Sequence, residues 1–282
     1  MRTRAFTLIE LLVVVSIIAV LIGLLLPALG SARLAARSVA CLSTMRQIQI
    51  GSLMYSEDNR GRLIEPGLPE GGIGPREELA WVNTLRQYVD EGIDHRSPGD
   101  LSPHWALERG GQGVHIPGFP GRFRATSYGV NDMVTSQLQV SLQPGDTAAT
   151  IATRYFNRMQ KIAAPALTCQ FLLMAEHGPF AGADHVHVQQ WATSSRFDPS
   201  YLPFFASQQA SIGAFGGAGG NWSEGYSGYS GDERAYVQNN AEDAGWGTAS
   251  NYTFLDGHGA TMKFGEVYEN EERNLFDPRL YR

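Results

Sequence analysis

Residues 6–29 read FTLIELLVVVSIIAVLIGLLLPAL and contain a single ionisable side chain, Glu10. About 20 mostly apolar helical residues cross the hydrocarbon core of a bilayer, so this run is long enough to span a membrane. A cleaved secretory signal has a shorter apolar core that ends at small residues, and no such site follows here. Arg2 and Arg4 precede the run, and the positive-inside rule places a basic flank in the cytoplasm. We therefore predict a retained membrane helix with a cytoplasmic amino terminus.

Beyond Pro27 the chain still has the pattern of a helix. Small or apolar side chains recur at alternating spacings of three and four residues, which keeps them on one helix face. The members of this face are Leu34, Ser38, Cys41, Met45, Ile48, Ser52 and Tyr55. Asp58, Asn59 and Gly61 indicate a stop, because Asn and Gly accept the left-handed geometry of a helix end. The pattern predicts one helix over residues 6–57.

The segment from Phe6 to Val14, FTLIELLVV, resembles the signature of type IV pilins and type II secretion pseudopilins. That signature has a short basic leader, a cleavage point before a Phe, and a Glu four residues after that Phe. In the family, a prepilin peptidase cuts on the cytoplasmic side of the apolar run and methylates the new amino terminus. The resemblance implies a cut between Ala5 and Phe6, although the usual residue before the cut is Gly, and N-methylation of Phe6. It also implies that Glu10 acts in assembly, where it approaches the amine of a neighbouring subunit.

Shorter stretches resemble a large bacterial group of pilin-like proteins with an Asp-Gly motif near the carboxyl terminus. They are residues 41–65, the run Ser127-Tyr128-Gly129-Val130-Asn131, and residues 251–258, which read NYTFLDGH. In that group a His usually lies ten positions before the Asp. Trp246 occupies that place before Asp256, so a role of the His is not carried over.

The remainder of the chain has the pattern of a globular α+β domain. We predict an amphipathic helix over residues 78–89, strands over 168–175 and 185–191, and a hairpin over 250–267. Asp256-Gly257 is the turn dipeptide of that hairpin. The expected fold class is α+β, with the long amino-terminal helix packed on an antiparallel sheet in a pilin-like arrangement.

The expected organisation has four parts and one loop. The parts are a leader over residues 1–5, a transmembrane helix over 6–29, its amphipathic continuation over 30–60, and an exported domain over 61–282. Residues 213–233 are rich in glycine and scattered tyrosine, and we predict an exposed loop there whose role is open. The pattern argues against a dinucleotide fingerprint, because no preceding strand and following helix are visible around this loop.

The metal-ligand candidates are His185 and His187, which lie two apart on a predicted strand and so project to the same face. Glu176, His177 and Asp184 are near in sequence, and zinc or copper accepts such groups. No third ligand is fixed by spacing, and two His occur on half-buried strands without a metal. We therefore expect no metal and no cofactor, and an anchored metallohydrolase built on this pair is the only enzyme alternative.

Other functional classes have little support. The net charge of -6, without clustered Lys and Arg, argues against nucleic-acid binding. No nucleophile motif such as G-x-S-x-G occurs, so we expect that the protein is not an enzyme. Asp256 lacks the oxygen-rich loop of a calcium site, which favours a plain turn. Whether Cys41 and Cys169 form a disulfide is left open.

These observations predict a pilin-like subunit of a type IV pilus or of a type II secretion pseudopilus, processed by prepilin peptidase. The expected partners are the peptidase, copies of itself or other pilins in a filament, and an inner-membrane assembly platform. The expected location is the bacterial inner membrane, crossed once, with the carboxyl-terminal domain in the periplasm or in a surface filament. The alternative is a non-polymerising membrane-anchored surface protein that binds a sugar or a metal.

Overall fold

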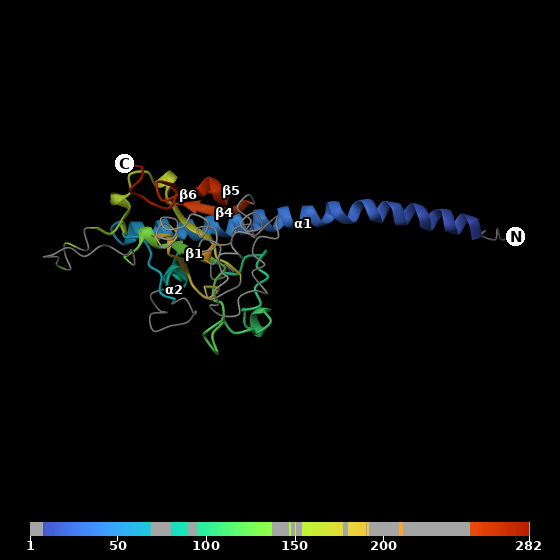
Figure 1. Cartoon of the computed structure of the whole chain (residues 1–282), viewed down its shortest axis with the longest axis horizontal. Helices are drawn as coiled ribbons and strands as arrows, with labels where there is room; N and C mark the ends of the chain where they lie inside the picture. Colours follow the sequence, from blue (N-terminus) through green and yellow to red (C-terminus); the bar gives the residue numbers. More distant parts are fainter. Residues whose placement is uncertain are drawn as a thin grey trace, which may run out of the picture.

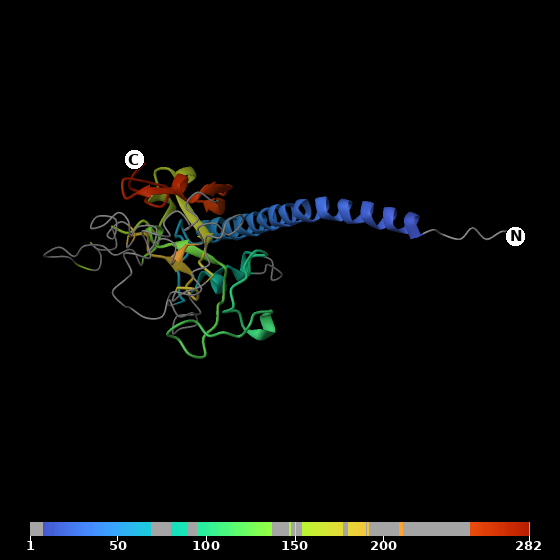
Figure 2. The same ribbon diagram turned by 45° about the vertical axis from the view of Figure 1, so that its right-hand side comes forward.

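The chain folds into a globular part and one long helix that projects far beyond it (Figure 1). The computed structural model describes residues 8–68, 80–89, 95–136, 147, 150, 154–176, 180–189, 191, 209–210 and 249–281. The helix α1 spans Leu8–Asp58, 51 residues, and is about 75 Å long. Only its second half lies against the globular part, and a second view gives the same arrangement (Figure 2).

The predicted long helix is confirmed over its described residues. It continues through Pro27, and the Ser31 hydroxyl donates a hydrogen bond to the Pro27 carbonyl oxygen at 3.2 Å. It ends where predicted: the Asn59 side-chain amide donates to the Tyr55 carbonyl oxygen at 2.8 Å. Arg60 and Gly61 then take left-handed backbone angles, with φ of 58° and 77°. This pair turns the chain away from the helix axis.

A five-stranded sheet lies beside the second half of α1. Its strands are β1 (Tyr128–Asn131), β2 (Cys169–Leu173), β3 (His185–Val186), β4 (Ala249–Phe254) and β5 (Gly259–Lys263), in the order β3-β1-β2-β4-β5. All neighbouring pairs are antiparallel except β1 and β3, which are parallel. The α+β class and the pilin-like arrangement are thus confirmed, and the sheet is mixed where an antiparallel one was predicted. β2 and β3 lie on opposite sides of β1. The chain reverses its direction between β2, which is antiparallel to β1, and β3, which is therefore parallel to it.

Short elements complete the globular part. They are α2 (Trp81–Thr84), η2 (Leu85–Gln87), η3 (Leu107–Arg109), η4 (Asp132–Val134), η5 (Met159–Lys161), η6 (Pro165–Leu167), α7 (Phe264–Val267), β6 (Tyr268–Asn270) and β7 (Arg273–Asn274). Of the helix predicted over residues 78–89, the structure has a shorter one, the α-helical turn α2 followed by the 3₁₀ turn η2. The strand predicted over 185–191 is wrong beyond Val186. The Asp132 carboxylate accepts a hydrogen bond from the Val188 backbone N–H at 3.1 Å, and residues 188–189 are helical.

One face of the sheet packs on α1 and α2. Cys41, Met45 and Ile48 of α1 share a buried cluster with Trp81 of α2 and Phe171 of β2. At Gly51 of α1 the neighbouring chain comes so close that an added Cβ would lie 2.4 Å from a Val89 methyl carbon. In the second half of α1, the helix face predicted from the sequence is therefore the face that is buried against the globular part.

The other face of the sheet carries a second, aromatic core. Its centre is Trp191, whose ring lies 5.3 Å from Tyr268 and 5.4 Å from Phe276, both edge-on. Tyr252 and Phe254 of β4 point into the same cluster. The sheet is thus buried on both sides, with aromatic side chains supplying most of the second layer.

A glycine is required in the turn that joins β4 to β5. Gly257 has a φ of 98°, and an added Cβ would lie 3.2 Å from a Leu53 methyl carbon of α1. We expect Gly257→Ala to lower the free energy of unfolding by about 1–2 kcal/mol, because an L side chain disfavours positive φ. Gly257→Asn adds the same Cβ but tolerates this geometry, so it should cost less. Urea unfolding of both variants tests this, and equal losses would mean that the contact with Leu53, and not φ, sets the requirement.

Candidate functional site

The first half of α1 presents a continuous apolar surface to its surroundings. Its large apolar side chains between Leu8 and Leu29 are from 46 % exposed at Val14 to 80 % exposed at Leu8. Among the described residues α1 is the one helix long and apolar enough to cross a membrane, and none of its most apolar window is buried. Glu10 lies in its first turn, where a carboxylate interacts favourably with the helix dipole.

The second half of α1 is tied to the sheet by buried polar contacts as well as by apolar packing. The Gln49 side-chain amide donates to the Gln170 side-chain oxygen at 2.8 Å, and the Thr253 hydroxyl donates to the Gln49 oxygen at 3.1 Å. Ser52 also donates to Gln170, at 3.1 Å. A register shift between Cys169 and Phe171 allows Gln170 and Phe171 both to face α1. These hydrogen bonds fix the helix at one rotation and one height on the sheet, since any slip would leave buried amides unpaired.

The side of α1 opposite to the sheet is exposed and carries no charge between residues 38 and 56 except at Arg46. The exposed side chains along this side are Val39, Ser43, Gln47, Ile50 and Met54. Val39 is 69 % exposed, Ile50 52 % and Met54 51 %. Arg46 is turned towards the sheet, where its guanidinium donates to the Gly259 carbonyl oxygen at 2.6 Å. We call this stripe the outer face of α1; it continues the apolar surface of the first half.

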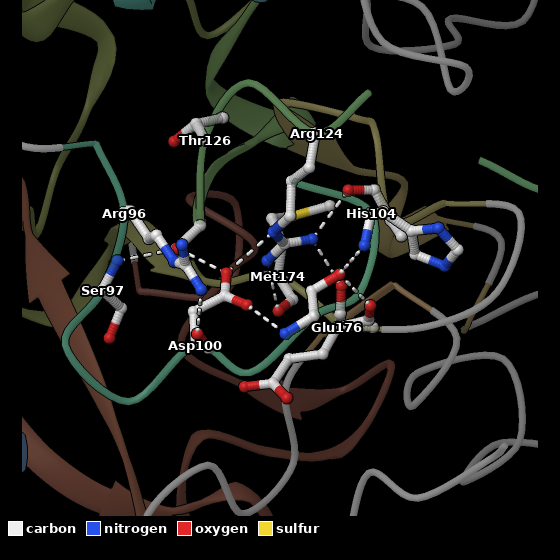
Figure 3. Close-up of polar contacts among 12 residues, drawn as sticks. Arg96, Ser97, Asp100, His104, Arg124, Thr126, Met174 and Glu176 are labelled. Atoms are coloured by element: carbon white, nitrogen blue, oxygen red, sulfur yellow. Dashed lines mark hydrogen bonds and ion pairs between the residues drawn. The ribbon is translucent and has the colours of Figure 1, made fainter. Parts of the chain in front are cut away.

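A buried ion pair holds the segment between α2 and β1 against the end of β2 (Figure 3). The Arg124 guanidinium donates to the Asp100 carboxylate at 2.8 Å, and the two side chains are 0 % and 3 % exposed. Arg124 also donates to the carbonyl oxygens of Ala175 and Ala181, both at 2.7 Å. The Ser127 hydroxyl donates to the same Asp100 carboxylate. Burial alone would raise the pKa of Asp100, but Arg124 and Ser127 more than offset it, and the pKa is lowered.

Glu176 lies beside this ion pair, and its pKa is shifted in the opposite direction to that of Asp100. Burial, and next the negative charge of Asp100, raise the pKa of Glu176 from 4.5 to about 7. A carboxyl group with a raised pKa stabilises the fold most below its unfolded pKa and loses that contribution as the pH rises. Glu176 therefore opposes folding increasingly between pH 4.5 and about 7. No sequence pattern predicted this cluster, because Asp100, Arg124 and Glu176 are far apart along the chain.

The structure brings His185 and His187 together. Their rings lie 4.6 Å apart, edge to face. His185 Nδ1 lies 3.0 Å from the Asp184 carboxylate and His187 Nδ1 lies 3.3 Å from the Asp132 carboxylate. Among the residues that the structure describes, no three His, Cys, Asp or Glu side chains form a group that could hold a metal ion. His177, a further candidate, lies outside the described residues.

The Asp-Gly motif forms the turn of the β4–β5 hairpin, as predicted. Asp256 accepts hydrogen bonds from the His258 backbone N–H at 3.1 Å and lies 2.6 Å from His258 Nδ1. The His258 ring stacks on Phe254 with 4.3 Å between the ring centroids. Burial would raise the pKa of Asp256, but the hydrogen bonds and charge of His258 lower it. The turn also packs on α1 through Gly257, so the motif positions the edge of the sheet on the helix.

A comparison with protein families identifies the start of the chain. A family model described as the prokaryotic N-terminal methylation motif matches residues 1–26. This stretch is a prepilin-type signal. Together with the exposed apolar helix, the one candidate membrane span among the described residues, it supports a prepilin-like, membrane-anchored protein. No curated protein and no solved structure was found to match the chain.

The structure describes the two cysteines but not the predicted cleavage point or the glycine-rich loop. Ala5, Phe6, Trp246 and the loop over residues 213–233 lie outside the described residues, so the cleavage point is still a prediction. Cys41 and Cys169 are free thiols. They lie in the two different buried clusters, and burial raises the pKa of both.

Proposed function

We propose that this chain is a subunit of a membrane-anchored filament, either a type IV pilus or a type II secretion pseudopilus. The observation that carries the proposal is the exposed apolar surface of α1, most of which lies within the prepilin-type signal and which continues along the helix as the uncharged outer face. A monomer would leave the outer face of α1 in water, whereas subunits packed side by side through α1 would cover it. In the membrane, the first half alone acts as the anchor.

The proposal includes the processing and placement of the chain. Prepilin peptidase cuts between Ala5 and Phe6 and methylates Phe6, and Glu10 then guides the new subunit into register. The leader occupies residues 1–5, the membrane helix 6–29 and its continuation 30–60, and residues 61–282 form the exported domain. The amino terminus faces the cytoplasm, and the exported domain lies in the periplasm or in a surface filament. An inner-membrane assembly platform and other pilin-like subunits complete the set of partners.

The mass of the mature chain tests the proposed cleavage and methylation. We expect the mature chain from the membrane fraction to begin at Phe6 and to carry one methyl group on its amino terminus. Intact-mass and amino-terminal peptide analysis would measure both, and cells that lack the prepilin peptidase provide the control. Retention of residues 1–5 in the wild-type membrane fraction would remove the processing step from the proposal.

Filament incorporation is the second measurement. Filaments sheared from cells, or pseudopili produced by overexpression, should contain the mature chain. A correctly processed chain that stays entirely in the membrane pool would instead favour a non-polymerising anchored protein.

A further inference from the structure

The large apolar side chains that the globular part exposes are concentrated in one stretch. Outside α1, those exposed among the described residues are Leu101, Leu107, Val114 and Leu167. Three of these four lie in residues 101–123, which we call the lobe. Leu107 is 72 % exposed, and its side chain lies 3.0 Å from a Cβ added at Gly113, the residue before Val114. Leu107 and Val114 therefore form one apolar tip on the lobe.

Contacts within the lobe hold this tip in place. Trp105 is 0 % exposed and forms the centre of the lobe, and the Arg109 guanidinium lies 4.7 Å from the centre of its ring. The Val114 backbone N–H donates to the Pro103 carbonyl oxygen at 3.2 Å. These contacts fix the chain on both sides of the tip, so Leu107 and Val114 cannot turn inward without breaking them. An apolar tip that is held in water in this way is typical of a surface that a partner covers.

The lobe lies on the side of the globular part from which the first half of α1 projects. In both views η3, the green turn that carries Leu107, lies towards that end (Figures 1 and 2). The segment that leads into the lobe meets α1 at Cys41, whose thiol lies beside the Ser97 hydroxyl. Cys41 follows Leu29, the end of the apolar run, by 12 residues. That separation is about 18 Å along a helix, of which the headgroup region takes about 5–8 Å. A lobe that reaches back towards the anchor therefore approaches the membrane surface.

We propose that the tip of the lobe rests in the headgroup region of the bilayer that holds α1, with Leu107 and Val114 inserted among the phospholipid headgroups. The proposal rests on the anchoring of the chain by the first half of α1, and filament assembly is not needed for it. Apolar side chains at a membrane surface enter the headgroup boundary by about 5–10 Å. Membrane helices tilt by about 20° on average, and such a tilt lowers a lobe that stands to one side of the helix.

The charge of the lobe agrees with a phospholipid surface. Residues 101–123 carry Arg109 and Arg122 against Glu108, a net charge of +1, in a chain whose net charge is -6. Lipid phosphates therefore attract this part of the chain, whereas they repel the remainder. The membrane is also the partner that the anchor keeps within reach of the lobe in every single subunit, before any neighbouring copy is present.

A fluorescent label on the tip allows the contact to be observed. Cys41 and Cys169 are both 0 % exposed, so a thiol reagent selects a cysteine introduced at the surface. The full-length chain with Leu107→Cys is labelled with the fluorophore NBD and placed at one copy per nanodisc of phosphatidylcholine and phosphatidylglycerol. A nitroxide on the lipid headgroup quenches only a fluorophore that lies close to the headgroups.

Leu167→Cys with the same label is the matched control, because Leu167 is 44 % exposed and lies outside the lobe. The next residue, Thr168, accepts a hydrogen bond from the Leu255 N–H at the β4–β5 turn. That turn packs on Leu53, which is farther along α1 from the anchor than Cys41.

We expect the label at position 107 to emit at a shorter wavelength and to be quenched by the nitroxide lipid, and the label at position 167 to show neither change. Val114→Asp in the chain labelled at position 107 should remove most of the quenching, because a carboxylate at the tip opposes insertion. Leu167→Asp in the same labelled chain should leave the quenching unchanged. Val114 is 45 % exposed, so its replacement should leave the melting temperature unchanged. If Val114→Asp lowers it, Val114→Ser replaces that variant and should remove a smaller part of the quenching.

Co-elution of the chain with the nanodisc separates the anchor from the lobe. A chain that does not co-elute would overturn the anchoring by α1, and the lobe contact with it. A chain that co-elutes but is quenched equally at positions 107 and 167 would overturn the lobe contact alone. Quenching and a wavelength shift at position 107 that appear only with two or more copies per disc would assign the tip to a neighbouring subunit, and this outcome also overturns the proposal.

Discussion

Replacing Glu10 by valine is expected to reduce incorporation of the chain into filaments about tenfold or more, while membrane insertion and cleavage continue. An unpaired carboxylate in an apolar span costs roughly 2.5–3.5 kcal/mol at the helix centre on insertion scales and less near its ends. In the proposed filament, the Glu10 carboxylate pairs with the amine of a neighbouring subunit and so penalises subunits in the wrong register. Valine removes both the attraction and the penalty, and the incoming subunit is no longer selected.

The measurement is the amount of mature chain in sheared filaments, divided by the correctly processed chain in the membrane fraction. Ser16→Val is the matched control, because its hydroxyl bonds within α1 to the Val13 carbonyl oxygen at 2.8 Å and the change leaves the apolar surface intact. It should incorporate at the wild-type level. If Glu10→Val also incorporates at that level, Glu10 serves another purpose, and the register hypothesis for α1 would be wrong.

The largest effect on stability is expected at Arg124. Arg124→Met should lower the free energy of unfolding of the globular part by about 3–5 kcal/mol, because it leaves the Asp100 carboxylate buried without its partner. It also leaves the carbonyl oxygens of Ala175 and Ala181 without the donor that they now share. Urea unfolding followed by tryptophan fluorescence is suitable, because Trp81, Trp105 and Trp191 are all buried.

Two variants make this prediction specific to the buried pair. Arg273→Met breaks an ion pair with Glu269 whose side chains are 73 % and 51 % exposed, and it should cost less than about 1 kcal/mol. Combining Asp100→Leu with Arg124→Met should cost less than the sum of the two single changes, since no buried charge remains. An additive double variant would show that the two charges do not depend on each other. If Arg124→Met fails to fold, Ser127→Ala gives a milder test at the same carboxylate.

The pair also sets an acid limit for the fold. Because the pKa of Asp100 is lowered in the folded chain, its contribution is complete above its unfolded value of 3.8 and is lost as the pH falls through the folded pKa. Glu176, with a raised pKa, acts with the opposite sign between pH 4.5 and about 7. In Arg124→Met, the free energy of unfolding measured in the same urea experiment should therefore no longer fall at low pH through the protonation of Asp100.

Local patterns in the sequence were sufficient for several elements. The run over residues 6–29, with the spacing of small and apolar residues after it, predicted α1 and its buried face. Asp256-Gly257 predicted the β4–β5 turn, because positive φ is a property of the residue at that position. The signature around Glu10 predicted the prepilin-type signal. Each of these signals depends on residues that are neighbours along the chain or that lie within one helix.

Contacts between distant segments decided the rest. The predicted strand over residues 185–191 stops at Val186 because the Asp132 carboxylate, from another part of the chain, binds the Val188 N–H. Gln170 was hidden inside an apolar strand pattern, and only the register shift in β2 turns it towards Gln49. Arg124 has the composition of a surface residue and is buried only because Asp100 and three carbonyl oxygens meet its guanidinium. Hydrophobic periodicity reports which side of an element is covered. It carries no information about which distant partner satisfies a buried charge or amide, and that choice was made by the tertiary structure.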